Sequence, residues 1–584
     1  MKIINNIEHQ LSKAQQTSDL KSARELVEYC KAQAPQQLLA AQEVLGSVFL
    51  QLGQATSAVE VFESIVVKTG KKDVTALNNF GVALANANFV ERSKSVLRLA
   101  LELRPDYAEA NFNLGNLLVS EKLNIEALKH YAVALDVQPD HLNARVNHAA
   151  VNLKLGNYNE AVAQIELALK FDNNNTLALL IIGEALEKLD RRQEAEVRLK
   201  KAIDGAPDML ECQISYLSIL IKNRKIVEAR RLSEKLALGS HSDHVILYNC
   251  GLLELVSGNI KAAVKNFQSS ISLKSDYLPG LRALEEIKVQ LSLAWNADKW
   301  LNEAPCDKDR DVDPYLRCLD LINKFVTGAP ISEAEIDTQF KELGTTKFHL
   351  TVSQLTFCTT YINFISKLRT LRKGNKDYSA SAIYWIGESH CLSLANHSII
   401  IDNTKLQIEP RIIFGAKMFH LASKRKNSYL GLLNMHAQSI PHGSRVILSF
   451  GEIDTRIDDG FQKYGNNLTW ESEIKRYAKA FLVMCDKLAK KYNLIIYILS
   501  VPAPVYHTSY NYQKNKNRSD LVRLLNLAIK KECADRNFIF LNVYDCTLNS
   551  SGFSNRQYHI DNYHLSPIMK SKIENQLNNA KRDK

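Results

Sequence analysis

Small residues recur at a fixed interval along the first half of the chain. Six positions follow one another every 34 residues, and all but Leu217 are small: Gly81, Gly115, Ala149, Gly183, Leu217 and Gly251. Twelve residues after each comes a second row: Ser93, Ala127, Ala161, Ala195, Ala229 and Ala263. An earlier unit carries Gly46, Ala58 and Phe62, and most units end at a helix-stopping position: Pro105, Pro139, Asn173 or Pro207. The period predicts a stack of helix pairs.

The two rows of small residues let the helices of a pair approach closely. We expect the large residues Tyr131, Leu199 and Phe267 to fill the space between successive pairs, and each proline to end a second helix. These features resemble the tetratricopeptide repeat over about residues 5–290. An all-α solenoid is therefore predicted for residues 1–290.

In most units a polar residue stands two positions before the residue of the first row. This position holds Asn79, Asn113, Asn147 and Asn249, with Ile181 and Ser215 in the other two units. In tetratricopeptide repeats this position lines the concave surface, where an amide can donate to and accept from an extended peptide. The pattern predicts a site for a protein or peptide partner. The alternative is that each asparagine bonds a carbonyl within the solenoid.

The 34-residue register stops near residue 291, and a helical connector is expected over 291–378. A charged break lies at 306–314, and apolar residues at helical spacing follow at 314–326 and 352–371. We expect these helices to cap the solenoid and join it to the next domain. A polar stretch, RKGNKDYSAS, marks the boundary.

Short apolar runs alternate with amphipathic segments over residues 379–584. Strands are predicted at 382–387, 397–402, 411–415, 445–451, 494–501 and 538–544, and helices at 472–492, 519–536 and the terminal SPIMKSKIENQLNN. Strands that are apolar on both faces indicate a three-layer α/β domain with a parallel sheet. In such domains functional residues collect at the carboxyl ends of the strands.

Chemically versatile side chains follow several of these expected strands. The first strand runs into Gly387-Glu388-Ser389-His390, and Asp561 precedes His564 in a spacing that lets one carboxylate orient an imidazole. A nucleophilic serine needs a base, and the base needs an acceptor that fixes its tautomer. Ser389, His564 and Asp561 are therefore the predicted catalytic residues. His390 is a rival base by proximity, but it lacks an orienting partner.

The order of these segments resembles the SGNH or GDSL hydrolase-like superfamily over about residues 380–580. The resemblance implies a flavodoxin-like fold and esterase, deacetylase or acyltransferase activity, commonly on acylated carbohydrate or lipid. It also implies an oxyanion hole made by the backbone amides of Ser389 and Gly415. Glu388 replaces the aspartate of the family's Gly-Asp-Ser turn, whereas Asp561 and His564 match its last block.

The third block departs from the family's Gly-x-Asn-Asp, because Ile453 stands where the asparagine helps to hold the oxyanion. A substitute donor could come from Asn434, Asn562 or Arg456. In that block Glu452, Asp454 and Arg456 are expected either to contact substrate or to form, with Glu388, an ion-pair lattice that orients the loop.

Charge is unevenly distributed over the 584 residues. Residues 380–584 hold 28 Lys and Arg against 17 Asp and Glu, which accounts for the whole net charge of +11. The excess suits an anionic or acylated glycan, or serves only as a solvated surface. The ten cysteines form no metal-ligand spacing, and no phosphate loop or dinucleotide turn is present, so no metal or cofactor is predicted. A start without an apolar leader predicts a cytoplasmic protein, with neither membrane nor nucleic acid as partner.

Two functions are consistent with these patterns. In the first, Ser389 and its partners hydrolyse or transfer an acyl group while the repeats hold a protein or glycoprotein. In the second, the chain is a scaffold whose repeats bind protein and whose hydrolase-like domain binds a ligand without turnover.

Overall fold

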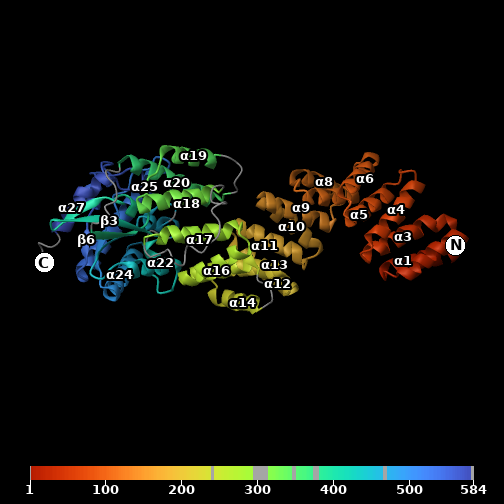
Figure 1. Cartoon of the computed structure of the whole chain (residues 1–584), viewed down its shortest axis with the longest axis horizontal. Helices are drawn as coiled ribbons and strands as arrows, with labels where there is room; N and C mark the ends of the chain where they lie inside the picture. Colours follow the sequence, from red (N-terminus) through yellow and green to blue (C-terminus); the bar gives the residue numbers. More distant parts are fainter. Residues whose placement is uncertain are drawn as a thin grey trace. The chain divides into compact units, whose positions relative to one another are not determined.

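A computed structural model describes residues 2–238, 243–293, 313–344, 350–371, 381–458, 460–464 and 470–579 (Figure 1). The chain divides into two compact units, Met1–Lys225 and Ile226–Lys584. The boundary predicted at residue 290 lies inside the second unit. The boundary predicted at 378 lies outside the described residues, as do most of the charged break and the polar stretch.

The first unit is a series of helix pairs. Its helices are α1 Lys2–Gln16, α2 Leu20–Gln33, α3 Leu38–Gln51, α4 Ala55–Lys68, α5 Val74–Asn86, α6 Val90–Leu103, α7 Ala108–Ser120, α8 Asn124–Val137, α9 Leu142–Leu155, α10 Tyr158–Phe171, α11 Thr176–Lys188, α12 Arg192–Gly205 and α13 Leu210–Lys222, with a short 3₁₀ helix at Pro35–Gln37. From α3 on, each helix packs against the next in the chain. The 34-residue period therefore corresponds to one helix pair.

The large residues of the repeat contact the small residue of their own pair. A Cβ added to Gly115 of α7 would lie 2.6 Å from the ring of Tyr131 in α8, and Leu199 stands in the same way over Gly183. Tyr131 also bonds Asn147 of the next pair, so the predicted position of these side chains between successive pairs is supplemented by this contact within the pair. The small residue is needed because the ring of its own partner helix rests directly on the backbone.

The second unit begins with the last repeat helices and ends with the α/β domain. Its helices are α14 Ile226–Leu238, α15 His244–Val256, α16 Ile260–Leu273, α17 Leu278–Leu291, α18 Pro314–Thr327, α19 Glu333–Leu343, α20 Val352–Leu371, α21 Met418–Leu421, α22 Ser428–Ser439, α23 Phe461–Tyr464, α24 Trp470–Tyr492, α25 Tyr512–Asp535, α26 Tyr544–Thr547 and α27 Lys570–Asn579. Its strands are β1 Ser381–Gly387, β2 Ser398–Ile401, β3 Thr404–Ile412, β4 Arg445–Ser449, β5 Ile495–Leu499 and β6 Ile539–Leu541. Short 3₁₀ helices lie at Ser389–Leu392, Ile453–Thr455 and Pro567–Met569.

The six strands form one mixed sheet in the order β2-β3-β1-β4-β5-β6. Five strands are parallel, and β2 pairs with β3 in the antiparallel direction, so the predicted all-parallel sheet is corrected at this edge. The cause is a two-residue turn at Asp402 and Asn403, both with positive φ, which returns the chain directly alongside itself. The strand predicted at 411–415 begins instead at Thr404.

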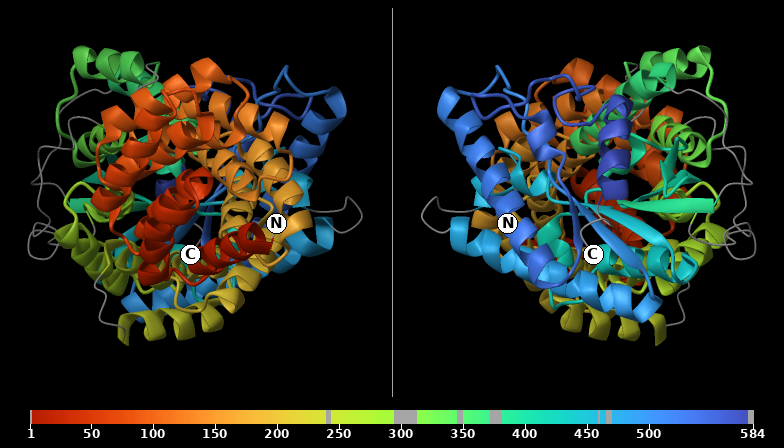
Figure 2. Two further views of the ribbon diagram at one scale, coloured as in Figure 1. Left: turned by 90° about the vertical axis from the view of Figure 1, so that its right-hand side faces the viewer. Right: turned by 90° about the vertical axis from the view of Figure 1, so that its left-hand side faces the viewer.

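Helices cover both faces of the sheet, as the right-hand view of Figure 2 shows. Alternate residues of β1 enter two separate cores: Tyr384 and Ile386 pack with α16, α17, α22, α24 and α25, whereas Ile383 and Trp385 pack with α18, α20 and α27. The end of the repeat array and the expected connector therefore supply covering helices of the α/β fold. No helix among the described residues is both long enough and apolar enough to cross a bilayer.

Candidate functional site

Ser389, His564 and Asp561 form a continuous chain of hydrogen bonds. Ser389 Oγ lies 2.7 Å from His564 Nε2, and His564 Nδ1 lies 2.7 Å from Asp561 Oδ2. Ser389 opens the 3₁₀ turn after β1, and the other two residues share one loop before α27. The fold thus brings together groups 175 residues apart. This arrangement can remove a proton from the hydroxyl and hold it on the imidazole.

The Asp561 carboxylate organises its whole turn. Its Oδ1 accepts the backbone N–H groups of Tyr563 and His564, both at 2.7 Å, while Oδ2 faces the imidazole. Burial opposes ionisation, but the bond to His564 and the two amides outweigh it, so the pKa of Asp561 lies well below its usual range. The carboxylate is therefore ionised and fixes Nδ1 as the protonated nitrogen.

A helix outside the predicted α/β domain completes the surroundings of the imidazole. The ring of Phe364 in α20 stacks on His564 with 3.9 Å between centroids and 20° between planes. Phe364 is 1% exposed and His564 is 2% exposed. Packing on one face and the Asp561 bond at one edge together restrict how the imidazole can turn.

Gly415 follows the strand beside the one that precedes Ser389. Gly387 pairs with Ile412, and Ile413 N–H donates to Gly387 O at 2.8 Å, so both loops leave the same sheet edge. Gly415 has φ +65°, and a Cβ there would meet no atom within 4 Å. The preceding Phe414 N–H donates to Gln290 Oε1 of α17 at 2.9 Å. The last repeat helix therefore holds the segment in which an oxyanion donor is expected.

The loop after β4 contains a buried ion-pair lattice around Glu452. Arg456 Nε donates to Glu452 Oε2 at 2.8 Å, and Arg518 of α25 donates to Oε1 at 2.8 Å. Burial alone would raise the pKa of Glu452, but the two guanidinium groups lower it to about 2. Both guanidinium groups lie over the Tyr563 ring, at 4.7 and 5.3 Å from its centroid. Because Tyr563 lies between Asp561 and His564 in sequence, the lattice supports the loop that carries them.

The other two acidic residues have separate surroundings. Asp454 accepts the N–H groups of Met418 and Phe419 at 2.7 and 3.3 Å, so it holds the start of α21 just after Gly415; burial raises its pKa to about 6. Glu388 is 2% exposed, and neither carboxylate oxygen has a hydrogen-bond partner among the described residues. Burial, with Glu452 nearby, raises the pKa of Glu388 well above its usual value.

The rival base His390 and the candidate oxyanion donor Asn434 were also considered from the sequence. His390 Nε2 has no partner among the described residues, and its ring centroid lies 5.4 Å from that of His564; burial lowers its pKa to about 3. His390 is therefore a neutral neighbour of His564. Asn434 is on α22, where its amide donates to Leu430 O at 2.8 Å.

The asparagines of the array use part of their amides within the solenoid. Asn113 donates to Asn78 Oδ1 at 2.9 Å, and Asn147 donates to Asn116 Oδ1 at 2.8 Å, each joining one repeat to the previous one. Asn79 Oδ1 accepts from Asn78 at 3.3 Å. Asn249 is 4% exposed and bonds Val245 O of its own helix at 2.9 Å. The amides of Asn79, Asn113 and Asn147 are partly buried and retain unused capacity.

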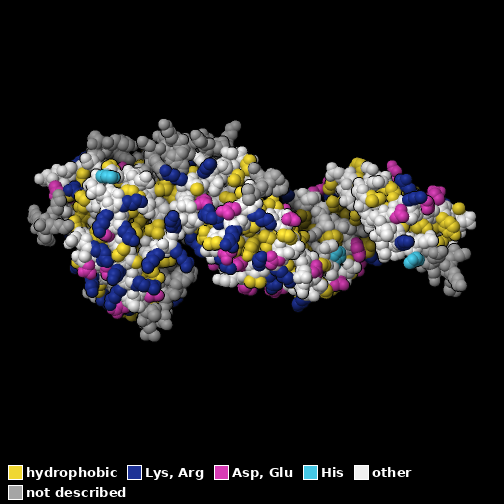
Figure 3. All heavy atoms as spheres, turned by 90° about the horizontal axis from the view of Figure 1, so that it is seen from below, with side chains coloured by type: hydrophobic (Ala, Val, Ile, Leu, Met, Phe, Trp, Pro, Cys, Tyr) yellow, Lys and Arg dark blue, Asp and Glu magenta, His cyan; other side chains and the backbone are white. Residues whose placement is uncertain are grey.

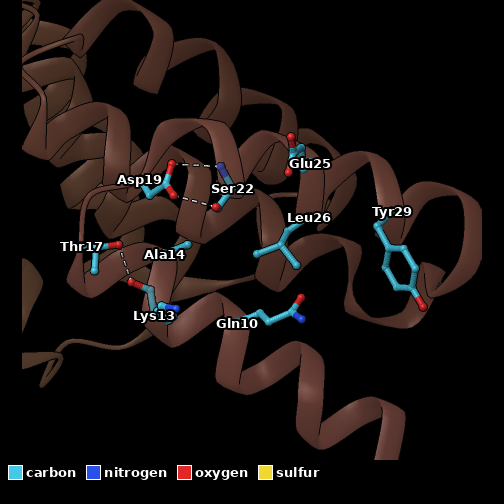
Figure 4. A pocket seen from close by; sticks show the side chains of 9 residues that line it. All are labelled: Gln10, Lys13, Ala14, Thr17, Asp19, Ser22, Glu25, Leu26 and Tyr29. Atoms are coloured by element: carbon cyan, nitrogen blue, oxygen red, sulfur yellow. Dashed lines mark hydrogen bonds between the residues drawn. The ribbon is translucent and has the colours of Figure 1, made fainter.

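A hollow of about 420 Å³ lies between α1 and α2 of the first unit (Figure 4). Its polar groups serve helix termini: Asp19 accepts both the N–H and the hydroxyl of Ser22, and Thr17 donates to Lys13 O. It contains no pairing of a nucleophile with a base. Within the described parts of the chain, no group of three or more His, Cys, Asp or Glu residues could hold a metal ion.

Four residues of the site were not identified from the sequence: Phe364, Gln290, Arg518 and Tyr563. All of them act through neighbours, and three come from helices that carry no motif. Tyr563 alone had a usable signal, because it lies inside the Asp-x-x-His segment.

Comparison with known proteins concerns the repeats. Residues 142–175 match the tetratricopeptide repeat. Protein O-mannosyl-transferase TMTC3 of Homo sapiens is 23% identical over 209 residues, 35% of this chain and 23% of that protein. The BBSome complex member BBS4 of Bos taurus is 24% identical over 260 residues, 44% of this chain and 49% of that protein. A tetratricopeptide repeat protein from Parabacteroides merdae covers 41% of this chain and 94% of its own at 17% identity, with a TM-score of 0.34.

The chain thus spans less than half the length of these two curated relatives. The match at 142–175 coincides with a helix pair, α9 and α10, in a series that keeps the same 34-residue period on both sides. The N-terminal region of the chain is a tetratricopeptide repeat array.

Proposed function

We propose that the α/β domain is a serine hydrolase or acyltransferase of the SGNH type, and that the repeat array brings it a protein or glycoprotein substrate. The observation that carries the proposal is the bonded series Ser389–His564–Asp561. Tetratricopeptide repeats are protein-binding modules, which supports a protein as the partner of the array.

The sheet topology adds independent support. Without β2, the five parallel strands lie in the order 2-1-3-4-5, which is that of flavodoxin-like folds. Strand order reverses between β1 and β4, which are paired neighbours. Ser389 follows β1 and Glu452 follows β4. Ligands of such folds bind beyond the carboxyl ends of the strands at this switch point.

The proposed reaction has two steps. Ser389 Oγ attacks the ester carbonyl as its proton passes to His564 Nε2, and the C–O bond to the leaving alcohol breaks as His564 returns that proton. Water or a second hydroxyl then attacks the acyl-enzyme by the same proton route. Asp561 stabilises the imidazolium, and the amides of Ser389 and Gly415 would bind the oxyanion. Arg456 bonds Glu452, so it helps to position the loop.

The proposal is tested by covalent labelling of the full chain with a fluorophosphonate, read by intact mass. Labelling should be lost in Ser389→Ala and reduced at least a hundredfold in rate in His564→Ala. Ser393→Ala is the matched control, because Ser393 is a buried serine of the same segment whose hydroxyl has no partner among the described residues. Equal labelling of Ser389→Ala and the parent protein would end the proposal.

The scaffold remains the second candidate, and one observation favours it: Ile453 occupies the position of the amide donor and is 7% exposed. A scaffold predicts no labelling of folded protein. It also predicts that Asn113→Ala with Asn147→Ala abolishes partner capture while Ser389→Ala leaves it intact.

A further inference from the structure

A hollow of about 580 Å³ lies within the second unit, where the last repeat meets the α/β domain. Its walls are the start of α16, the loop at 424–427, one side of α22 and the end of α24. On the face shown in Figure 3, Lys and Arg side chains gather over the C-terminal α/β part. The hollow is therefore set in the region that carries the excess positive charge of the sequence.

Four lysines line this hollow: Lys261, Lys424, Lys426 and Lys491. None of the described lining residues is an aspartate or a glutamate. The remaining polar groups are amides and a hydroxyl, including Asn434, Gln438 and Tyr492. Cations that line a concave surface create a local positive potential, which attracts anions.

A helix terminus contributes to the same potential. Asn259 precedes α16 and makes no side-chain cap to it, while its amide N–H donates to Glu254 Oε2 at 2.6 Å. The first N–H groups of α16 thus lack a side-chain acceptor at a wall of the hollow, and the positive end of the helix dipole adds to the lysine charges.

The two walls are fixed against each other by direct backbone contact. A Cβ added to Gly258 would lie 2.7 Å from Asn427 O, and one added to Gly431 would lie 2.6 Å from Gly258 O. Gly258 also has φ +80°. Tyr492 donates to Asn434 Oδ1 at 3.4 Å across the opposite wall. The hollow is therefore preformed, which lowers the entropic cost of binding.

We propose that this hollow binds a small phosphorylated polyol. The ammonium groups of Lys424, Lys426 and Lys491 would hold the phosphate, and the amides and the tyrosine hydroxyl would bond the hydroxyl groups of the body. The volume lies in the range of small-molecule pockets and exceeds what a bare phosphate fills. Lysine binds phosphate as a point charge without the geometric demands of an arginine fork. The site does not depend on the proposed hydrolase activity.

The test is calorimetric titration of the full chain with glucose 1-phosphate at low ionic strength, with glucose and inorganic phosphate as companion probes. Glucose 1-phosphate should bind at one site, more tightly than either companion. The double variant Lys424→Gln with Lys426→Gln should weaken binding about tenfold, because two of the ammonium groups that would face the phosphate are removed. Added salt should weaken binding further.

Lys479→Gln is the matched control, because Lys479 is exposed on α24 but does not line the hollow. It should leave the affinity unchanged. Three results would overturn the proposal: no heat from glucose 1-phosphate, equal weakening by the control and the double variant, or binding only to phosphatidylcholine vesicles that contain a phosphoinositide. The last result would assign the surface to a membrane.

Discussion

At the scale of single residues, the candidate site depends on which carboxylates are charged. The pKa of Glu452, which bonds two guanidinium groups, is lowered, whereas the pKa of Glu388, which has no cation bonded to it, is raised by burial and by Glu452 nearby. The pKa values of two buried glutamates near one turn are therefore shifted in opposite directions, because only one of them bonds a cation directly.

Replacing Glu452 by glutamine should destabilise the second unit by about 3 kcal/mol, because the buried Arg518 and the partly exposed Arg456 would both lose their counter-charge. Urea unfolding of the full chain measures the change. Glu471→Gln is the control, since Glu471 pairs with Lys475 on the surface and its loss should leave unfolding unaltered. Equal stability of Glu452→Gln and the parent would contradict the lattice.

Glu388→Gln should become more stable than the parent as pH rises. The folded pKa of Glu388 lies above the unfolded value, so the folded chain binds the additional proton and the parent loses stability from about pH 4.5 upward. The amide cannot ionise and escapes this loss. Urea unfolding at pH 5 and pH 8 checks the sign: a gap between variant and parent that narrows with pH would show that Glu388 is ionised in the fold.

At the scale of elements, α20 has a role that its sequence did not reveal. Phe364→Leu keeps an apolar side chain but removes the flat surface on which His564 rests. We expect about tenfold slower fluorophosphonate labelling with about 1 kcal/mol lost in stability, because a loosened imidazole spends less time in line with Ser389.

Phe357→Leu separates this effect from a general loosening of the helix. Phe357 lies on the same helix and touches Tyr361 and Phe414, with ring centroids 4.6 and 5.2 Å away. Its replacement should slow labelling far less than Phe364→Leu. Equal slowing in both variants would assign the effect to α20 as a whole.

Elements with a strong local signal were predictable from the sequence. The repeat helices follow from the 34-residue period, and β1, β4 and β5 follow from uninterrupted apolar runs bounded by polar residues. The start of β3 was missed, because polar residues and Pro410 interrupt it. The proline is tolerated because β2 pairs only with Thr404–Gln407, so one side of the strand is free at Pro410.

Part of the site could be predicted because its proposed chemistry needs particular residue types: the serine Ser389, the base His564 and the carboxylate Asp561. Its supporting contacts could not be predicted, because Phe364, Gln290 and Arg518 are ordinary core or helix residues until the fold brings them together. The Asp402–Asn403 turn did carry a local signal, since these residue types tolerate positive φ.

At the scale of the whole molecule, the α/β fold is not self-sufficient. The apolar faces of its sheet are covered by α16 and α17 on one side and by α18 and α20 on the other. Residues 379–584 expressed alone should aggregate or bind 8-anilinonaphthalene sulfonate, because these faces would be open to water.

Residues 226–584, which include all four covering helices, should be monodisperse and unfold cooperatively. Size-exclusion chromatography and dye fluorescence of the two fragments measure the difference. A monodisperse, cooperatively unfolding 379–584 fragment would show that the covering helices are dispensable.

The helices α15–α17 are part of the repeat array and also part of the α/β fold. Gly258, between α15 and α16, packs against Asn427, and Gln290 of α17 accepts a bond from Phe414. Duplication or loss of a pair within residues 74–205 changes only the length of a solenoid. Duplication of α15–α17 would place a second set of helices where the sheet has no face for them. Loss of α15–α17 would leave one face of the sheet uncovered. Over evolutionary time the array is therefore free to gain or lose units ahead of α15, whereas α15–α17 are kept because the sheet needs them as cover.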